Sequence, residues 1–336
     1  MTFHFLFIIR NLHGLSSFPI GNFGKFCLSG IRKADPVWKS RVRGLDFPRG
    51  SGKMKGGLEN FFVQEKRRDP MSNRPLAVVT GASDGMGKEF ARELAAMGND
   101  LLLTARRGYV LDSLKKELEA AYGISVETMP MDLSELENIR MLEEKIESSD
   151  RLLWLVNCAG FGAGEGVFPD VSADVETRML LLHNVAPMRL CRAALIPMKI
   201  NGRGFIINVA SVAGFLASRG AVDYSATKAF LITFSRALQC DCAGTDVHVQ
   251  AFCPGFVRTG FHDSETMKNS PLKDQVPGFM WDSAPRVVKK SIRAVQKRHF
   301  RRVVFIPTLF YRLITRIMSG RLLAPVRILL TGGQTR

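Results

Sequence analysis

Short apolar runs alternate with amphipathic stretches along the chain from residue 76 onward. The apolar runs predict seven strands, at residues 76–80, 100–105, 125–130, 152–157, 204–210, 247–253 and 303–306. Helical periodicity predicts helices between them, near residues 86–97, 111–122, 134–148, 173–199, 223–243 and 283–297. This alternation is typical of a parallel sheet covered on both faces. The sequence therefore predicts an α/β fold with a doubly wound, seven-stranded parallel sheet and ligands at the carboxyl ends of its strands.

Only the middle of the chain carries this pattern. Residues 1–70 contain recurrent Gly and Pro without a helical or strand period, which predicts a disordered extension or an upstream stretch outside the functional protein. Residues 71–306 are predicted to form a single domain, and residues 307–336 a basic amphipathic C-terminal tail. No apolar run reaches the roughly 18 residues of a membrane-spanning helix, which argues against a polytopic membrane protein.

Charge is distributed unevenly along the 336 residues, whose formal net charge is +16. Residues 1–70 hold 13 basic and 5 acidic side chains, and residues 286–336 hold 13 basic and no acidic ones. The body, residues 71–285, has 21 basic against 26 acidic side chains. Because nucleic-acid binding needs clustered Lys and Arg on the folded surface, we expect no nucleic-acid partner. The six cysteines form no CxxC pair, which predicts reduced thiols and a cytoplasmic location.

A glycine-rich turn, TGASDGMG, follows the first predicted strand directly and leads into a helix. Glycines in this context let the chain turn tightly and let backbone N–H groups approach a pyrophosphate, whose charge the helix N-terminus favours. A simple strand-to-helix turn is the alternative. The turn predicts a dinucleotide site with contacts from Gly81, Ser83, Asp84, Gly85, Met86 and Gly87.

The end of the second strand indicates which dinucleotide is bound. An NAD site carries Asp or Glu there for the ribose 2′-hydroxyl, whereas Arg accommodates the 2′-phosphate of NADP. Ala105 occupies the expected acid position and is followed by Arg106 and Arg107. We therefore expect NADP(H), with a merely solvated arginine pair as the alternative. The segments after the third and fourth strands are expected at the same edge and carry Asp132, Leu133, Asn157, Ala159 and Gly160.

A serine, a tyrosine and a lysine form the candidate catalytic group. Ser211 follows the fifth strand, and Tyr224 and Lys228 lie four residues apart on one face of a predicted helix. A tyrosine has an ordinary pKa of about 10, and nearby positive charge, supplied by Lys228 and the oxidised nicotinamide, favours its phenolate. Ser211 can hydrogen-bond a substrate oxygen and orient it toward Tyr224. The group therefore predicts acid–base chemistry at Tyr224.

These motifs together resemble the short-chain dehydrogenase/reductase family over roughly residues 74–306. The resemblance rests on TGASDGMG, NCAG, a serine 13 residues before YSATK, and PGFVRT. It implies a Rossmann fold and hydride transfer, without a metal, between NADP(H) and a carbonyl or secondary alcohol. It also implies that Tyr224 is the catalytic acid/base, Lys228 its activator and ribose ligand, and Ser211 the group that orients the carbonyl.

The family pattern implies roles for further residues. Asn184 matches the asparagine that holds a proton-relay water. Asp132 and Leu133 match the adenine contact, and Thr259 resembles the residue that binds the nicotinamide amide. Cys158 departs from the pattern, which usually has a second Asn there, and predicts altered packing at most. The remaining implied cofactor contacts are Pro254, Gly255 and Val257.

The expected substrate is a small-molecule ketone or alcohol. TGASDGMGKEFA and the arginine pair resemble the branch of 3-ketoacyl and hydroxysteroid reductases, which is compatible with a lipid-like ketone. Fold-level likeness alone does not choose the substrate. The alternatives are a catalytically silent NADP(H)-binding sensor and a membrane-associated interaction protein on the same scaffold.

The C-terminal tail leaves three interpretations open. Its apolar series contains no acid and is punctuated by basic residues, which fits an interfacial membrane helix. Packing against a second subunit or the substrate lid, and a loose tail, are the other two. Gly320 and Pro325 interrupt the helix. We expect a homo-oligomer and, on the first interpretation, a peripheral membrane contact through residues 307–336.

Overall fold

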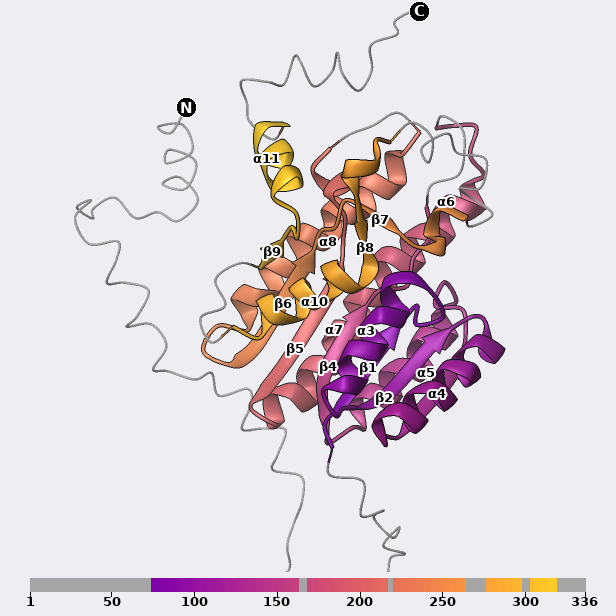
Figure 1. Cartoon of the computed structure of the whole chain (residues 1–336), viewed down its shortest axis with the longest axis vertical. Helices are drawn as coiled ribbons and strands as arrows, with labels where there is room; N and C mark the ends of the chain where they lie inside the picture. Colours follow the sequence, from indigo (N-terminus) through magenta and orange to yellow (C-terminus); the bar gives the residue numbers. More distant parts are fainter. Residues whose placement is uncertain (1–73, 163–167, 217–219, 264–275, 298–302, 319–336) are drawn as a thin grey trace, which may run out of the picture. The chain divides into compact units, whose positions relative to one another are not determined.

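Seven parallel strands form one sheet in the computed structural model, which describes residues 74–162, 168–216, 220–263, 276–297 and 303–318 (Figure 1). The strands are β1 (Leu76–Thr80), β2 (Asp100–Ala105), β3 (Val126–Pro130), β4 (Leu152–Asn157), β5 (Arg203–Val209), β6 (Asp246–Phe252) and β9 (Val304–Phe305). Their order is β3-β2-β1-β4-β5-β6-β9. The order reverses between β1 and β4, so the predicted doubly wound sheet is confirmed, with the last strand shorter than expected.

Helices cover both faces of the sheet (Figure 1). One face carries α3 (Gly85–Ala96), α4 (Gly108–Tyr122) and α10 (Ala284–Val295), and the other α5 (Leu136–Glu147), α7 (Ala186–Ile200) and α8 (Val222–Asp241). Successive strand residues point to opposite faces. Val79 accordingly packs with Phe90 of α3, whereas Val78 packs with Leu190 of α7. Strands buried on both faces explain why they read as continuous apolar runs.

The long helix predicted over residues 173–199 is interrupted. It consists of α6 (Ala173–Leu180), the π-helical turn η2 (Leu181–Val185) and then α7. A π-turn inserts one extra residue into a helix, which a 3.6-residue periodicity does not reveal. The interruption lies at the carboxyl edge of the sheet, beside α8, and therefore concerns the site.

Short elements at the same edge were not predicted. They are the 3-10 turns η3 (Val212–Phe215), η4 (Gly260–Asp263) and η5 (Gly278–Met280), and the strands β7 (Phe256–Arg258) and β8 (Trp281–Ser283). β7 and β8 pair in parallel as a separate small sheet. Elements of three or four residues leave no periodic signal in a sequence.

The beginning of the predicted C-terminal tail is a helix, α11 (Leu309–Met318), that packs on the domain. Tyr311 of this helix is only 4% exposed. The described residues all belong to one unit, Arg67–Arg336. The predicted extension 1–70 and the rest of the tail, 319–336, lie outside the described residues.

One described helical stretch, Ala173–Ile200, is long and apolar enough to cross a membrane by length and composition. Half of its most apolar window is buried inside the protein. Leu190, Ala194 and Met198 within it belong to the core cluster under α5 and α7. Its packing is therefore that of a core helix.

Candidate active site

The turn between β1 and α3 depends on glycine at three positions. Gly81 and Gly85 have φ angles of 69° and 51°, in the left-handed region that favours glycine. A Cβ on Gly87 would lie 2.1 Å from the carbonyl oxygen of Gly81, which leaves no room for a side chain. The turn can therefore bring its backbone close to a pyrophosphate at the N-terminus of α3.

The side chains of two other residues in this turn contact the protein itself. Asp84 caps α3, because its Oδ1 accepts the backbone N–H of Gly85 at 2.6 Å. A Cβ on Gly260 would lie 2.0 Å from Asp84 Oδ2, so the carboxylate abuts the start of η4. Met86 packs against the core. Because these side chains are engaged elsewhere, Asp84 and Met86 could contact a cofactor only through their backbone groups.

The arginine pair at the end of β2 is exposed to solvent. Arg107 Nη2 donates a hydrogen bond to Ser83 Oγ at 3.1 Å, so this side chain reaches across to the glycine turn. Arg106 lies near enough to Asp132 to favour its charged form. Arg107 therefore borders the glycine turn, and Arg106 lies near Asp132.

Asp132 and Leu133 follow β3 at the same edge. Asp132 Oδ1 accepts from the backbone N–H and the hydroxyl of Ser134, and Oδ2 accepts from Arg178 at 3.0 Å. Burial raises the pKa of the Asp132 carboxyl, but the Ser134 hydrogen bonds and the charges of Arg106 and Arg178 outweigh it and hold this pKa below its ordinary value. Leu133 is buried in the core. Asp132 is therefore a fixed, charged residue just after β3.

The end of β4 is tied to the end of β1. Thr80 Oγ1 accepts the backbone N–H groups of Cys158 and Ala159, both at 3.0 Å. The Asn157 side chain does not face this edge, because its Nδ2 donates to Asn208 Oδ1 at 2.8 Å inside the sheet. Asn157 therefore cross-links β4 and β5 beneath the site, and the backbone around Ala159 borders it.

Ser211, Tyr224 and Lys228 meet beyond the carboxyl end of β5. The hydroxyl groups of Ser211 and Tyr224 are hydrogen-bonded. Lys228 is 6% exposed, and its Nζ lies 5.5 Å from the centroid of the Tyr224 ring and donates to Val209 O at 3.1 Å. Ser211 Oγ also accepts the N–H of Ala213 at 3.1 Å, which fixes the serine at the start of η3. The sequence spacing thus brings these three side chains together.

Burial controls the protonation of this group. It raises the pKa of Tyr224 to about 12, although the Ser211 hydrogen bond acts in the other direction. It lowers the pKa of Lys228 to about 8, against the opposing effect of Cys158 and Cys253. In the protein alone, burial is the largest effect on the pKa of Tyr224, and the phenolate expected from Lys228 together with the oxidised nicotinamide stays a prediction. Tyr224 is a phenol at neutral pH, which is the acid form.

Asn184 lies in the π-turn η2 and contacts the Tyr224 helix. Its Nδ2 donates to the backbone oxygen of Thr227 at 3.1 Å. The neighbouring His183, which the sequence analysis missed, is hydrogen-bonded to Phe161 and Thr227. Two polar residues inside the apolar stretch LLHNVA are the signal that singles out this turn. π-turns occur frequently at functional sites.

The segment after β6 reaches the glycine turn. A Cβ on Gly85 would lie 2.9 Å from Thr259 Cβ, so the two loops touch. Pro254 O accepts the N–H of Val212 at 3.0 Å, next to Ser211, and Val257 is buried. This segment therefore spans from the glycine turn to η3.

A tyrosine of α11, to which the sequence analysis gave no role, packs on Gly255. A Cβ there would lie 2.0 Å from the Tyr311 ring. The Tyr311 hydroxyl donates to Met280 O at 2.8 Å and accepts the Phe256 N–H at 3.3 Å. Tyr311 thus ties Phe256 of β7 to Met280 of the turn η5, which lie 24 residues apart in the chain. Its contact with Phe256 spans 55 residues, which sequence patterns do not predict.

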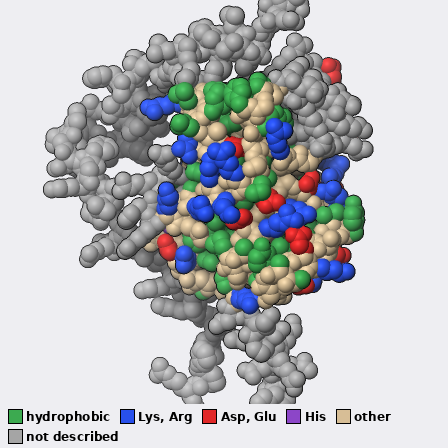
Figure 2. Space-filling view, viewed as in Figure 1, with side chains coloured by type: hydrophobic (Ala, Val, Ile, Leu, Met, Phe, Trp, Pro, Cys, Tyr) green, Lys and Arg blue, Asp and Glu red, His purple; other side chains and the backbone are tan. Residues whose placement is uncertain are grey.

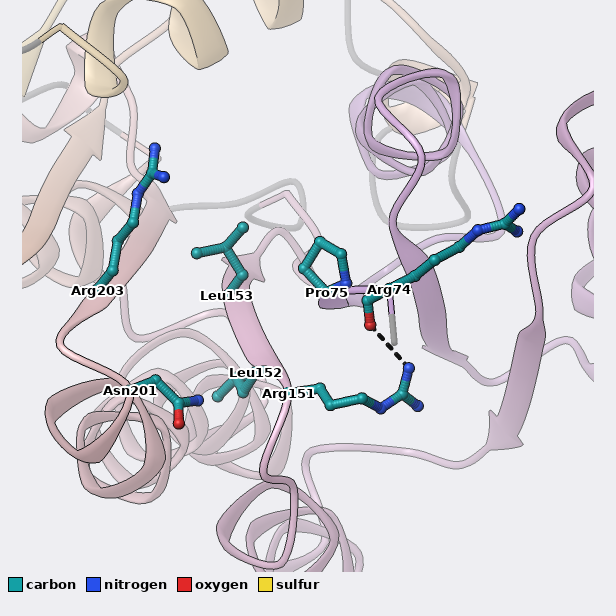
Figure 3. A pocket seen from close by; sticks show the side chains of 7 residues that line it. All are labelled: Arg74, Pro75, Arg151, Leu152, Leu153, Asn201 and Arg203. Atoms are coloured by element: carbon teal, nitrogen blue, oxygen red, sulfur yellow. Dashed lines mark hydrogen bonds between the residues drawn. The ribbon is translucent and has the colours of Figure 1, made fainter. Parts of the chain in front are cut away.

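A pocket of about 300 Å³ lies at the opposite edge of the sheet (Figure 3). Its lining includes Leu152 of β4 and Arg203 of β5, at the amino ends of these strands. Arg151 is already bound to Asp100 at 2.7 Å and to Arg74 O at 2.8 Å. Figure 3 shows the Arg74 and Arg203 side chains on opposite sides of the pocket, without a common target. None of the predicted site residues lines it.

The sheet order and the glycine turn define a dinucleotide-binding fold of the Rossmann type. The sequence family described as short chain dehydrogenase matches residues 75–270. The chain belongs to this family, as its motifs indicated.

Similar proteins agree with this assignment. A very-long-chain 3-oxoacyl-CoA reductase of Danio rerio is 33% identical over 186 residues, which are 54% of this chain and 58% of that protein. An NADP-dependent 3-hydroxy acid dehydrogenase of Schizosaccharomyces pombe is 33% identical over 187 residues, 55% of this chain and 72% of that protein. The chain thus spans little more than half the length of the Danio rerio protein.

The fold also matches solved structures. A short-chain dehydrogenase from Sphingobium yanoikuyae, solved in complex with NADPH, superimposes with a TM-score of 0.65 at 28% sequence identity. The match covers 78% of this chain and 96% of that one. The similarity therefore extends beyond the glycine turn to most of the described domain.

Proposed function

We propose that this chain is an NADP(H)-dependent oxidoreductase that reduces a carbonyl to a secondary alcohol, with Tyr224 as the acid. The observation that carries the proposal is the meeting of Ser211, Tyr224 and Lys228 at the sheet edge that also holds the glycine turn. A proton donor next to a dinucleotide site is what carbonyl reduction requires.

The residues of the cofactor site fit NADP(H). The backbone at Gly87 leaves no room for a Cβ, as a turn that cradles phosphate requires, and Arg107 borders it with the charge that a 2′-phosphate needs. The names of the NADPH complex and the NADP-dependent relative support the same cofactor. When bound, NADPH supplies a hydride to the carbonyl carbon.

The chain's own residues handle the proton. Tyr224 holds a proton on its phenol oxygen at neutral pH and can pass it to the carbonyl oxygen. Ser211, hydrogen-bonded to that phenol, can hold the same carbonyl oxygen. The Lys228 ammonium stabilises the negative charge that develops on the phenol oxygen. Asn184 holds α8 through Thr227 O, one turn beyond Tyr224.

A lipid-like ketone is the proposed substrate, with 3-oxoacyl thioesters as the first class to test. The name of the Danio rerio relative supports this class. The surroundings of the phenol are also apolar, since the Phe261 ring lies 6.2 Å from the Tyr224 ring and Phe161 packs beside His183. An apolar site suits a substrate whose only polar reacting group is the carbonyl.

The direct test is NADPH consumption by the purified chain with 3-oxoacyl thioesters, steroid ketones and short ketones. Tyr224→Phe should lower kcat by about 10²- to 10⁴-fold, because it removes the acid but keeps the ring. Tyr122→Phe, in α4 and exposed, is the matched control and should leave kcat unchanged. NADPH binding without consumption on the whole panel would contradict the enzyme proposal and favour a silent NADP(H) sensor.

A homo-oligomer is proposed on the basis of exposed apolar residues on α7 and α8. Met188, Ile196 and Ile200 of α7 and Phe230 of α8 are 42%, 48%, 80% and 40% exposed. Exposed apolar side chains on two helices that cover the same face of the sheet suit a subunit contact. Light scattering after size-exclusion chromatography tests this, and Ile200→Glu should shift the protein toward monomer. A monomeric wild-type chain would contradict it.

A peripheral membrane contact through the C-terminal segment is proposed as well. Leu309 and Leu313 of α11 are 77% and 57% exposed beside Arg312 and Arg316, and Figure 2 shows hydrophobic side chains gathered near α11. Exposed apolar residues with basic neighbours fit an anionic membrane surface. Leu309→Glu with Leu313→Glu should abolish flotation with anionic vesicles, and flotation that persists would contradict the contact.

A cytoplasmic location is also proposed. The free thiols of the five described cysteines suit a reducing compartment.

A further inference from the structure

The hydrogen bonds of His183 define its tautomer. The ring is buried, 1% exposed, in the π-turn η2. The backbone N–H of Phe161 can only donate, so His183 Nε2, 3.1 Å away, must accept. The proton of a neutral ring then lies on Nδ1, which donates to Thr227 Oγ1 at 3.1 Å. The Thr227 hydroxyl directs its own hydrogen to the backbone oxygen of Tyr224 at 2.8 Å, which agrees with this assignment.

The imidazole ring joins two segments that the site needs at a fixed separation. One is the loop after β4, which approaches so closely that a Cβ on Gly160 would lie 2.8 Å from Nε2. The other is α8, gripped at Thr227, three residues after Tyr224. The rings of His183 and Tyr224 meet edge to face, with centroids 5.9 Å apart and planes at 74°. Asn184, the next residue, binds the backbone oxygen of the same threonine.

We propose that His183 is a positioning residue for Tyr224, an inference that rests on the proposed function. Its rigid ring separates the loop after β4 from α8, and its edge fixes the tilt of the Tyr224 phenol. Misplacing a reacting group by about 1 Å can lower a rate by about 100-fold. Histidine suits this role because it presents a donor and an acceptor from opposite sides of one flat ring.

Three substitutions separate the two hydrogen bonds. His183→Leu removes both and leaves the N–H of Phe161 without its partner. His183→Gln can still accept from Phe161, and His183→Asn can still donate to Thr227. We expect kcat to fall about 10- to 100-fold in the leucine variant and less in the other two. NADPH affinity should change by less than about threefold in the glutamine variant, because it keeps the bond to the loop after β4, where Ala159 and Gly160 are expected to border the cofactor.

The matched control is His248→Gln. His248 lies in β6 near its amino end and bonds Val295 O at 2.9 Å, away from the site. It should leave kcat within about twofold of the wild type. Thermal unfolding of each variant shows which ones fold. If the leucine variant does not fold, the glutamine and asparagine variants carry the test alone.

A double-mutant cycle distinguishes positioning from general destabilisation. If His183 acts through the Tyr224 hydroxyl, adding His183→Leu to Tyr224→Phe should lower the residual kcat by less than about twofold. Full additivity, or folded His183 variants with wild-type kcat, would overturn the inference. A Tyr224→Phe variant with wild-type kcat would instead overturn the proposed function, so the two failures are distinct.

Tyrosine ring NMR gives a readout that needs no substrate. The chain has four tyrosines, and Tyr224→Phe identifies the Tyr224 signal among them. We expect one sharp Tyr224 signal in the wild type and broadening or a second signal in His183→Leu, with Tyr311 unchanged. A Tyr224 signal that stays single and sharp in the leucine variant would show that the ring does not need His183 and would refute the proposal.

Discussion

The two edges of the sheet are built from the same strands but differ in how their polar groups are arranged. At the amino edge, Arg151 binds Asp100 and Arg74 O, so charges are paired with protein partners. At the carboxyl edge, burial moves the pKa of Tyr224 up and that of Lys228 down, which disfavours the charged form of both. The difference indicates that paired charges stabilise the amino edge, whereas the buried Tyr224 and Lys228 cost stability at the carboxyl edge.

The largest effect should come from Lys228→Met. Removing the ammonium should lower kcat by at least about 100-fold, because the charge on Tyr224 then develops without a neighbouring cation. The same change should raise the free energy of unfolding by about 1–3 kcal/mol near neutral pH, since a buried charge is removed. Loss of the hydrogen bond to Val209 O offsets part of this gain.

The pH dependence of this stability gain has a definite sign. Burial lowers the pKa of Lys228 to about 8, so between pH 8 and about 10.4 the unfolded chain binds more protons than the folded one. Wild-type stability therefore gains from Lys228 as pH rises through this window, and the advantage of Lys228→Met should shrink. Thermal unfolding across pH measures it, with exposed Lys199→Met as control. An advantage that grows with pH would contradict a buried ammonium.

The next largest effect should come from Gly87→Ala. The added Cβ would lie 2.1 Å from Gly81 O, so the turn must open before α3 can form. We expect NADPH affinity, measured by fluorescence titration, to fall by about 100-fold, equivalent to about 2.7 kcal/mol. Gly278→Ala is the control, because nothing lies within 4 Å of its Cβ position. Equal NADPH affinities in the two variants would contradict the proposal that the glycine turn holds the phosphates of the cofactor.

Arg107→Ala should have a smaller and selective effect. Its guanidinium reaches Ser83 at the glycine turn, where the 2′-phosphate of NADPH is proposed to lie. Losing one exposed charge–phosphate contact should weaken NADPH binding by about tenfold and leave NADH binding within about twofold. NADH is therefore an internal control in the same variant. If the binding of NADPH and of NADH weakened equally, the role of Arg107 would be to hold the glycine turn in place and not to select the cofactor.

Sequence patterns were sufficient to predict those features that depend on residues close together in the chain. The alternation of strands and helices, the glycine turn and the four-residue spacing of Tyr224 and Lys228 were all predictable, since each depends on residues within one or two elements. The side-chain direction of Asn157 was not. Its place at the strand end predicted a contact at the edge, but its amide binds Asn208 of the neighbouring strand.

Long-range packing accounts for the other differences. His183 reaches Phe161 across 22 residues and Thr227 across 44, and a helical periodicity gives no sign of the π-turn that places it. Tyr311 fits over Gly255 only because α11 returns to the site after β9. The pKa of Tyr224 also depends on burial, which a sequence does not provide.

The smallest effect on activity should come from the amino edge, in Arg151→Ala. Its partner Asp100 has a side chain only 6% exposed and would keep just the N–H of Ser125, at 3.0 Å. Because Arg151 itself is one-third exposed, solvent screens the pair, and we expect a loss of about 1 kcal/mol in unfolding free energy. That corresponds to a melting temperature lower by about 2–4 °C.

Activity should not follow this loss of stability. With Arg151→Ala folded at the assay temperature, kcat/KM should stay within about twofold of the wild type, because the substitution alters no group at the carboxyl edge. Arg203→Ala is the matched control at the same pocket. Its side chain is 56% exposed and 3.8 Å from Asp246, so its melting temperature should not change measurably. A tenfold fall in kcat/KM in either variant would mean that the two edges are coupled through the strands, and the division between them would not hold.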